Sequence, residues 1–310
     1  MSSGGSTHNA NIGTVSGGVV VNGDVNRLDG YFAASASPPR PEPEQAPDEA
    51  TSRVDVGVLT VLSQETRAVA DAFARTGTSV RGLHDGRRTY EATFRTPQGA
   101  LTAVLMQTLD RGALSATAAT VSLIQGYRPA VVALVGIAGG IDPNLAVGDV
   151  VIPDQVIYYD GRRIAADGVH RRGEATRLPR EATLAVNDFF STRGEPVTLL
   201  APGRRAAFRV VRGSLGSGGA VVTDQHAEIR RYLRTFDEKC RVVETEAGGL
   251  VQAVREQVPG PQAPVSWLVV RGVSDHADAT KGHRDHDLAA AHAAAAFVEL
   301  LPFLVPRAAA

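Results

Sequence analysis

The chain has 310 residues, of which 43% are hydrophobic and 21% are charged, a composition typical of a globular protein with a substantial core. Its formal net charge of -1 argues against nucleic acid or an acidic membrane surface as the main partner. The single cysteine, Cys240, excludes an intramolecular disulfide and a cysteine-based zinc site, and we expect a buried, unreactive thiol.

The start of the chain carries no basic cluster and no long apolar run, so we expect no secretory signal. No stretch approaches the roughly 18 uninterrupted apolar residues that a membrane span requires. Together with the lone cysteine, these observations predict a cytoplasmic protein without a membrane span.

Composition divides the chain into three regions. Residues 1–32 form a low-complexity segment that is rich in glycine, serine, asparagine and valine. Residues 33–53 contain five prolines mixed with acidic residues, which predicts an extended linker because such a stretch cannot form a core. Residues 54–310 have the composition of one folded domain.

The core of the first region, residues 11–26, reads NIGTVSGGVVVNGDVN. Its β-branched residues and turn-forming glycines predict a short strand–turn–strand. Because a linker isolates it, the segment resembles bacterial amyloid-signalling motifs, which implies assembly with a like motif on a receptor by strand addition. A disordered tail is the alternative, since four glycines are more than a steric zipper usually carries.

In the third region, strand-like and helix-like segments alternate. We expect strands at residues 54–62, 90–95, 101–106, 130–140, 150–156, 210–213, 241–244 and 267–273. We expect helices at residues 65–75, 112–125, 181–190, 224–235, 246–254 and 285–301. This alternation predicts an α/β fold in which helices cover both faces of a mostly parallel or mixed sheet.

Three carboxylates follow predicted strands, namely Glu65, Glu246 and Asp275, and the glycine-rich turn 136–140 ends another strand. Glycine allows backbone to approach a ligand closely. Because ligands of such sheets bind at the carboxyl ends of the strands, the sequence predicts a site that combines these elements.

Four segments carry a family resemblance: VLTVLSQE, LVGIAGGIDPNLAVGDVVIPDQVIYYD, VVETEAGGL and RGVSDHAD. In this order they resemble the nucleoside phosphorylases and methylthioadenosine/S-adenosylhomocysteine nucleosidases, and the nucleosidase branch most closely. The resemblance extends over residues 54–304. It implies a three-layer α/β/α domain with a central mixed sheet, which hydrolyses the N-glycosidic bond of a purine nucleoside or nucleotide.

The resemblance also implies roles for the three carboxylates. Asp275 resembles the general acid that protonates N7 of the leaving purine, so it must carry a proton when it acts. Glu246 resembles the residue that binds the ribose hydroxyls and faces the cationic sugar of the transition state. Glu65 resembles the base that activates water. Glu244 shares the strand end with Glu246, and we expect it to be structural.

Further residues of the same motifs are expected to bind the substrate: Ala138, Gly139, Val221, Thr245 and Ser274. An aromatic residue commonly stacks on the base where this chain has Val221, which weakens the expectation of a thioadenosine substrate. No cofactor is expected. His276, His283, Asp285 and His286 suggest a metal cluster, but we favour a solvated loop that caps a helix, because the family needs no metal.

Three alternatives stay open. The first is a phosphate-dependent phosphorylase in which Arg67 and Arg111 bind phosphate, although the chain lacks a "G-D-P-x-R" segment after its first strand. The second is a nucleotide sensor that binds without cleaving. The third concerns the basic residues between 162 and 205, which form either a solvated loop or a lid that binds the phosphates of a nucleotide such as ATP.

The resemblance implies two further properties. Family members form oligomers, so we expect a homo-oligomer. Some members serve in bacterial defence by destroying nucleotides, which suggests a defence or cell-death effector whose N-terminal motif pairs with a receptor.

Overall fold

The computed structural model describes residues 12–15, 18–21, 53–97, 99–203, 206–256, 265–278 and 282–304. The chain divides into two compact units, residues 1–50 and residues 51–310. The predicted linker at residues 33–53 lies outside the described residues, except for Arg53.

The first unit contains one described element, an antiparallel hairpin of β1 (Ile12–Val15) and β2 (Gly18–Val21). Its register places Ile12 opposite Val21 and Val15 opposite Gly18. The two strands that the sequence predicts are therefore confirmed in the backbone. Its assembly with a like motif stays a prediction.

The helices of the second unit are α1 (Ser63–Thr76), α2 (Ala113–Tyr127), α3 (Arg180–Arg193), α4 (Glu228–Phe236), α5 (Ala247–Arg255) and α6 (His286–Leu304). The strands of its first half are β3 (Val56–Thr60), β4 (Thr78–His84), β5 (Arg87–Thr96), β6 (Gly99–Gln107), β7 (Val131–Gly140) and β8 (Val150–Tyr158). The remaining strands are β9 (Arg162–Ala165), β10 (Gly168–Arg171), β11 (Glu174–Arg177), β12 (Val197–Leu200), β13 (Ala207–Ser217), β14 (Cys240–Glu244) and β15 (Ser266–Asp275).

Eleven of these strands form one mixed sheet in the order β11-β8-β13-β14-β7-β3-β6-β5-β4, with β12 paired to β13 and β15 paired to β7 and β8. Three adjacent pairs are parallel: β6 with β3, β3 with β7, and β7 with β15. By contrast, β15 is antiparallel to β8, and β14 is antiparallel to β7. The predicted central mixed sheet is confirmed. The parallel arrangement brings the ends of β3, β7 and β15 to one edge.

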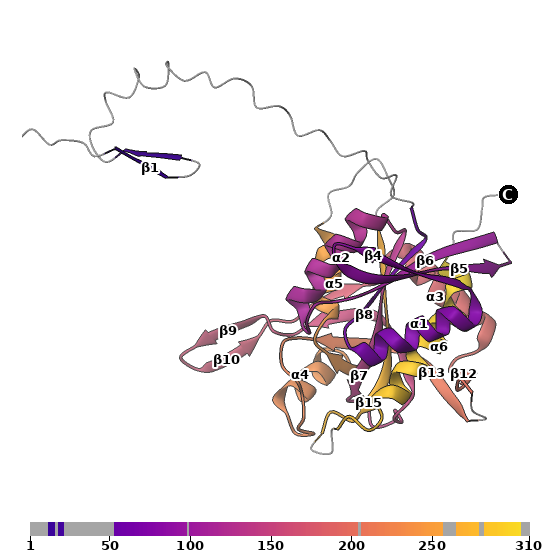
Figure 1. The fold of residues 1–310 in the computed structure, drawn as a ribbon. Helices are drawn as coiled ribbons and strands as arrows, with labels where there is room; N and C mark the ends of the chain where they lie inside the picture. The colour runs from indigo at the N-terminus through magenta and orange to yellow at the C-terminus, as the bar shows by residue number, and fades with distance from the viewer. Residues whose placement is uncertain are drawn as a thin grey trace, which may run out of the picture. The chain divides into compact units, whose positions relative to one another are not determined.

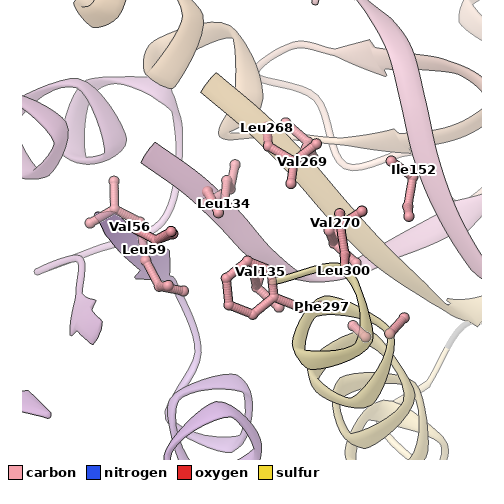
Figure 2. Close-up of a cluster of buried hydrophobic side chains, with 14 of the residues drawn as sticks. Val56, Leu59, Leu134, Val135, Ile152, Leu268, Val269, Val270, Phe297 and Leu300 are labelled. Atoms are coloured by element: carbon pink, nitrogen blue, oxygen red, sulfur yellow. The ribbon is translucent and has the colours of Figure 1, made fainter. Parts of the chain in front are cut away.

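Helices cover both faces of this sheet (Figure 1). Helices α1, α3 and α6 pack together, and α2 packs on α5. Figure 2 shows part of the hydrophobic core, in which Phe297 and Leu300 of α6 lie against strand residues that include Val135 and Val270. By length and composition α6 also suits a membrane span, but 56% of its apolar window is buried, as in the core helix of a globular domain.

Local sequence explains how the elements begin and end. All five residues of β3 are buried, as its continuous apolar run predicts for a central strand. Helix α2 ends at Arg128 in the left-handed conformation, directly before Pro129, which cannot continue a helix.

The sequence analysis missed the strands β4, β9, β10, β11 and β12. Several of their residues are exposed, so apolar alternation is weak there, and pairing with a neighbouring strand stabilises them instead. The hairpin of β9 and β10 extends away from the rest of this unit (Figure 1).

Candidate active site

The second unit contains a cavity of about 230 Å³ at the ends of β3, β7, β14 and β15. Every residue that the sequence analysis assigned to catalysis or substrate binding lines it, namely Glu65, Ala138, Gly139, Val221, Thr245, Glu246, Ser274 and Asp275. These residues are separated by up to 210 positions in the chain, so only the fold brings them together. Their placement is established here, and their roles remain predictions.

Backbone amides hold the carboxylate of Glu65, which is 2% exposed, in a fixed orientation. Its Oε2 accepts the N–H groups of Val61 at 2.8 Å and Leu62 at 2.7 Å, which connects β3 to the start of α1. Its Oε1 accepts the N–H of Ile137 on β7 at 2.8 Å. Burial raises the pKa of Glu65 above its ordinary value, although Arg271 and the three amides oppose this.

A buried arginine, Arg271 on β15, joins three glutamates of the cavity. Its Nη2 contacts Glu244 and lies 3.2 Å from Oε2 of Glu246, and its Nη1 lies 3.9 Å from Oε1 of Glu65. A side chain at Gly136 would overlap both Arg271 and Glu65, so a glycine leaves the room that the network needs. Arg271 therefore fixes the distances between carboxylates that come from three elements.

The two glutamates of the VVETEA segment have different surroundings. Glu244 accepts the N–H groups of Glu246 at 3.1 Å and Ala247 at 3.0 Å, which anchors the start of α5. Burial raises the pKa of Glu244, Arg271 lowers it, and the neighbouring Glu246 raises it further. Glu246 instead reaches across the cavity, where its Oε1 accepts the N–H of Gly112 at 2.9 Å.

Asp275 is the last residue of β15, and it is 7% exposed. Its Oδ1 accepts the N–H of Ala277 at 2.8 Å, and its Oδ2 lies 2.7 Å from the hydroxyl of Ser274, which also approaches the carbonyl of Ala138. A Cβ at position 139 would come within 3.2 Å of Oδ1, so Gly139 keeps the face of this carboxyl open.

Part of the cavity lining is apolar and consists of Ala220, Val221, Val222 and Val243. No phenylalanine, tyrosine or tryptophan is among the described residues that line the cavity, which agrees with the missing aromatic residue noted in the sequence. The wall suits the flat, apolar face of a base. We name this part of the cavity the base end.

Another part of the lining, which we name the mouth, consists of Arg111, His283 and His286, of which Arg111 and His283 are exposed. His286 is 8% exposed and is the first residue of α6, so the expectation of a solvated loop is wrong for this residue. Among the described residues, no group of three or more histidine, cysteine, aspartate or glutamate side chains is arranged to hold a metal ion.

The other basic candidates lie elsewhere. Arg67 is exposed and does not line the cavity. None of the described basic residues between 162 and 180 lines it either, and Arg171 is engaged by Glu228 at 2.7 Å. Residues 162–177 form the strands β9, β10 and β11 rather than the loop that was expected, and their basic side chains give no support to the phosphate lid. Arg204 and Arg205 lie outside the described residues.

Sequence reasoning gave no role to two residues of this site, Arg271 and Gln64. An arginine inside the apolar strand WLVVRGV was a usable signal, because a buried charge needs nearby carboxylates. Gln64 carried no comparable signal, since its contact with His286 joins residues that are 222 positions apart.

Comparison with known proteins identifies related sequences. The family model described as the phosphorylase superfamily matches residues 55–302. "ATP nucleosidase Cap17" of Escherichia coli strain KTE188 is 27% identical over 254 residues, which cover 76% of this chain and 49% of that protein. A 5'-methylthioadenosine/S-adenosylhomocysteine nucleosidase of Marinomonas sp. strain MWYL1 is 30% identical over 170 residues, which cover 53% of this chain and 64% of that protein. The chain thus spans about half the length of the first relative.

A solved structure shows the same fold. The 5'-methylthioadenosine/S-adenosylhomocysteine nucleosidase of Neisseria meningitidis, in complex with methylthio-immucillin-A, superposes with a TM-score of 0.62. The match has 22% sequence identity and covers 80% of this chain and 98% of that chain.

Proposed function

Because the chain belongs to the phosphorylase superfamily, we propose that it hydrolyses the N-glycosidic bond of a purine nucleoside or nucleotide and releases the free base. One observation supports this proposal, which is that Asp275, Glu65 and Glu246 line a single cavity. Two relatives named as nucleosidases support the reaction type.

Asp275 is the proposed general acid. The C1'–N9 bond breaks with both electrons moving into the purine, and N7 receives the proton of the Asp275 carboxyl, so that the base leaves as a neutral molecule. Gly139 leaves the face of this carboxyl open, while Ser274 and the N–H of Ala277 orient it.

The sugar becomes cationic as the bond breaks, and carboxylates stabilise that charge. Glu246 is the proposed partner of the ribose hydroxyls, and Arg271 and Gly112 hold its two oxygens. Glu65 takes a proton from the attacking water, whose oxygen then bonds to C1'. Transfer of that proton through solvent to Asp275 restores the starting state.

The charge of the deep part of the cavity favours water over phosphate as the nucleophile. Glu65, Glu244 and Glu246 surround Arg271, whose charge they already compensate. A phosphate dianion would be repelled by these carboxylates, and Arg271 is already paired with all three of them.

Base release measured by liquid chromatography tests the proposal. The full chain is incubated with adenosine, inosine, methylthioadenosine, S-adenosylhomocysteine, AMP and ATP, with and without phosphate. Release without phosphate is the expected result. Release that requires phosphate would show a phosphorylase, and binding without release would show a nucleotide sensor.

We propose a second role for the N-terminal unit, as a segment that assembles with like segments and controls a defence effector. The antiparallel register of β1 and β2 supports it, because a two-stranded hairpin leaves both edges able to accept a further strand. The full chain is expected to form assemblies that bind an amyloid dye, whereas a chain without residues 1–32 is not. Equal dye binding by both chains would contradict this role.

A further inference from the structure

We propose that the mouth of the cavity is a binding site for the 5'-phosphate groups of the substrate, so that this chain prefers nucleotides to nucleosides. The site is formed by Arg111, His283 and His286. The inference rests on the proposed function, because it adds a second half to the same substrate site.

Two backbone connections place the mouth next to the sugar. Arg111 directly precedes Gly112, whose N–H donates to Glu246 at 2.9 Å. Gln64 directly precedes Glu65, and its Nε2 lies 3.4 Å from Nδ1 of His286. The residues of the mouth are therefore connected to the two carboxylates assigned to the sugar. A 5' substituent of a ribose held by these carboxylates lies within reach of them.

Arg111 has the exposure and charge that a phosphate requires. Its side chain is exposed, and among the described residues no carboxylate lies within ion-pair distance of its guanidinium. The nearest acidic neighbour in the chain, Asp110, accepts the backbone N–H of Arg111 at 2.7 Å. A guanidinium that is not already committed offers two parallel N–H donors to a phosphate.

The histidines supply the opposite side of the site. Nδ1 of His283 lies 3.4 Å from Nδ1 of His286, and the two rings are nearly perpendicular. Each imidazole can donate a hydrogen bond to a phosphate oxygen from at least one ring nitrogen in any protonation state.

The charge inside the cavity fixes the direction in which the substrate lies. Glu65, Glu244 and Glu246 line the cavity and outnumber Arg271, the cation that contacts all three, so they repel phosphate groups from their own surroundings. A nucleoside with a neutral 5' group would gain no charge-assisted hydrogen bond from Arg111, so it would bind more weakly than a nucleotide.

The test compares how strongly the full chain prefers a nucleotide. The ratio of kcat/KM for AMP and ATP to kcat/KM for adenosine is measured for the wild type, for Arg111→Gln and for His283→Gln. The matched control is Arg88→Gln, an exposed arginine on β5 that does not line the cavity. We expect Arg111→Gln to lower the ratio by about 10- to 100-fold, the effect of losing hydrogen bonds to a charged group.

His283→Gln is expected to lower the ratio less, because glutamine keeps one donor. The control should leave it unchanged. A ratio that Arg111→Gln leaves within twofold of the wild-type value would overturn the proposal. So would a wild type that cleaves adenosine as efficiently as AMP and ATP.

A binding measurement separates this proposal from the proposed function. ATP and adenosine are titrated into Asp275→Asn by calorimetry, with and without Arg111→Gln. If no substrate releases base but Arg111→Gln still weakens ATP binding by tenfold more than adenosine binding, the hydrolase assignment fails and the phosphate site stands. If both ligands weaken equally, the phosphate site fails.

Discussion

Two groups of side chains at the cavity are built on different principles. Glu65, Glu244 and Glu246 surround Arg271, all four are buried, and backbone amides donate to the oxygens of the glutamates. At the mouth, Arg111 and His283 are exposed side chains on loops. Under the proposed function, the comparison teaches that fixed geometry is concentrated at the residues assigned to bond cleavage, while the residues assigned to substrate selection are exposed and free to change.

The largest effect is expected from removing the proton donor in Asp275→Asn. Asparagine can keep the hydrogen bond from Ala277 but cannot protonate N7, so base release should fall by about 10²- to 10⁴-fold with little change in substrate binding. Liquid chromatography of the released base measures this. The exposed Asp71→Asn on α1 is the control, and an Asp275→Asn enzyme that retained more than a tenth of the wild-type rate would refute the assignment.

The second prediction breaks the network in the depth by Arg271→Met. Methionine fills similar space but leaves three buried glutamates without their cation, which should lower the free energy of unfolding by about 3–5 kcal/mol. Urea denaturation followed by circular dichroism measures the change. The exposed Arg88→Met should change it by less than about 0.5 kcal/mol. Equal stability of the two variants would mean that Arg271 is not needed to compensate these charges.

The third prediction concerns pH. Burial raises the pKa of Glu65 above the ordinary value of 4.5, so it stays protonated to a higher pH and cannot then accept a proton from water. The rate kcat should therefore decline as pH falls through a value above 4.5, and Glu65→Gln should remove this decline. The raised pKa of Glu65 affects the stability of the fold in the opposite direction to the rate. Its contribution to the free energy of unfolding is fully present below pH 4.5 and is lost as the pH rises through the pKa of Glu65 in the folded protein.

A pH–rate profile over pH 4 to 8 checks this, with circular dichroism at each pH to exclude unfolding. An acidic decline centred at or below 4.5 would show that Glu65 is not the group that limits the rate.

The smallest effect is expected at the base end from Val221→Phe. An aromatic ring beside the purine should add about 0.5–1.5 kcal/mol of stacking, which lowers KM about two- to tenfold. Steady-state kinetics measure it, with the exposed Val80→Phe on β4 as the control. An increase in KM would show that the base lies elsewhere, and would require a revised division of the cavity into base end and mouth.

Several elements could be predicted from local sequence. The apolar run of β3 and the helical spacing in α2 and α6 predicted elements that the structure contains within a few residues. Exposed strands such as β9 and β11 could not be predicted, because their stability comes from partners rather than from their own pattern.

For the candidate site, the sequence by itself determined which residue types stand at the strand ends, because Glu65, Glu246 and Asp275 each follow an apolar run. Ligands of such sheets bind at the carboxyl ends of the strands, so these three residues could be assigned to one site. Only the tertiary structure decided that Arg271 joins these glutamates and that Arg111 and His286 border the same cavity. The physical reason is distance along the chain: hydrogen-bond and charge partners from separate elements meet only when the sheet and its helices have packed.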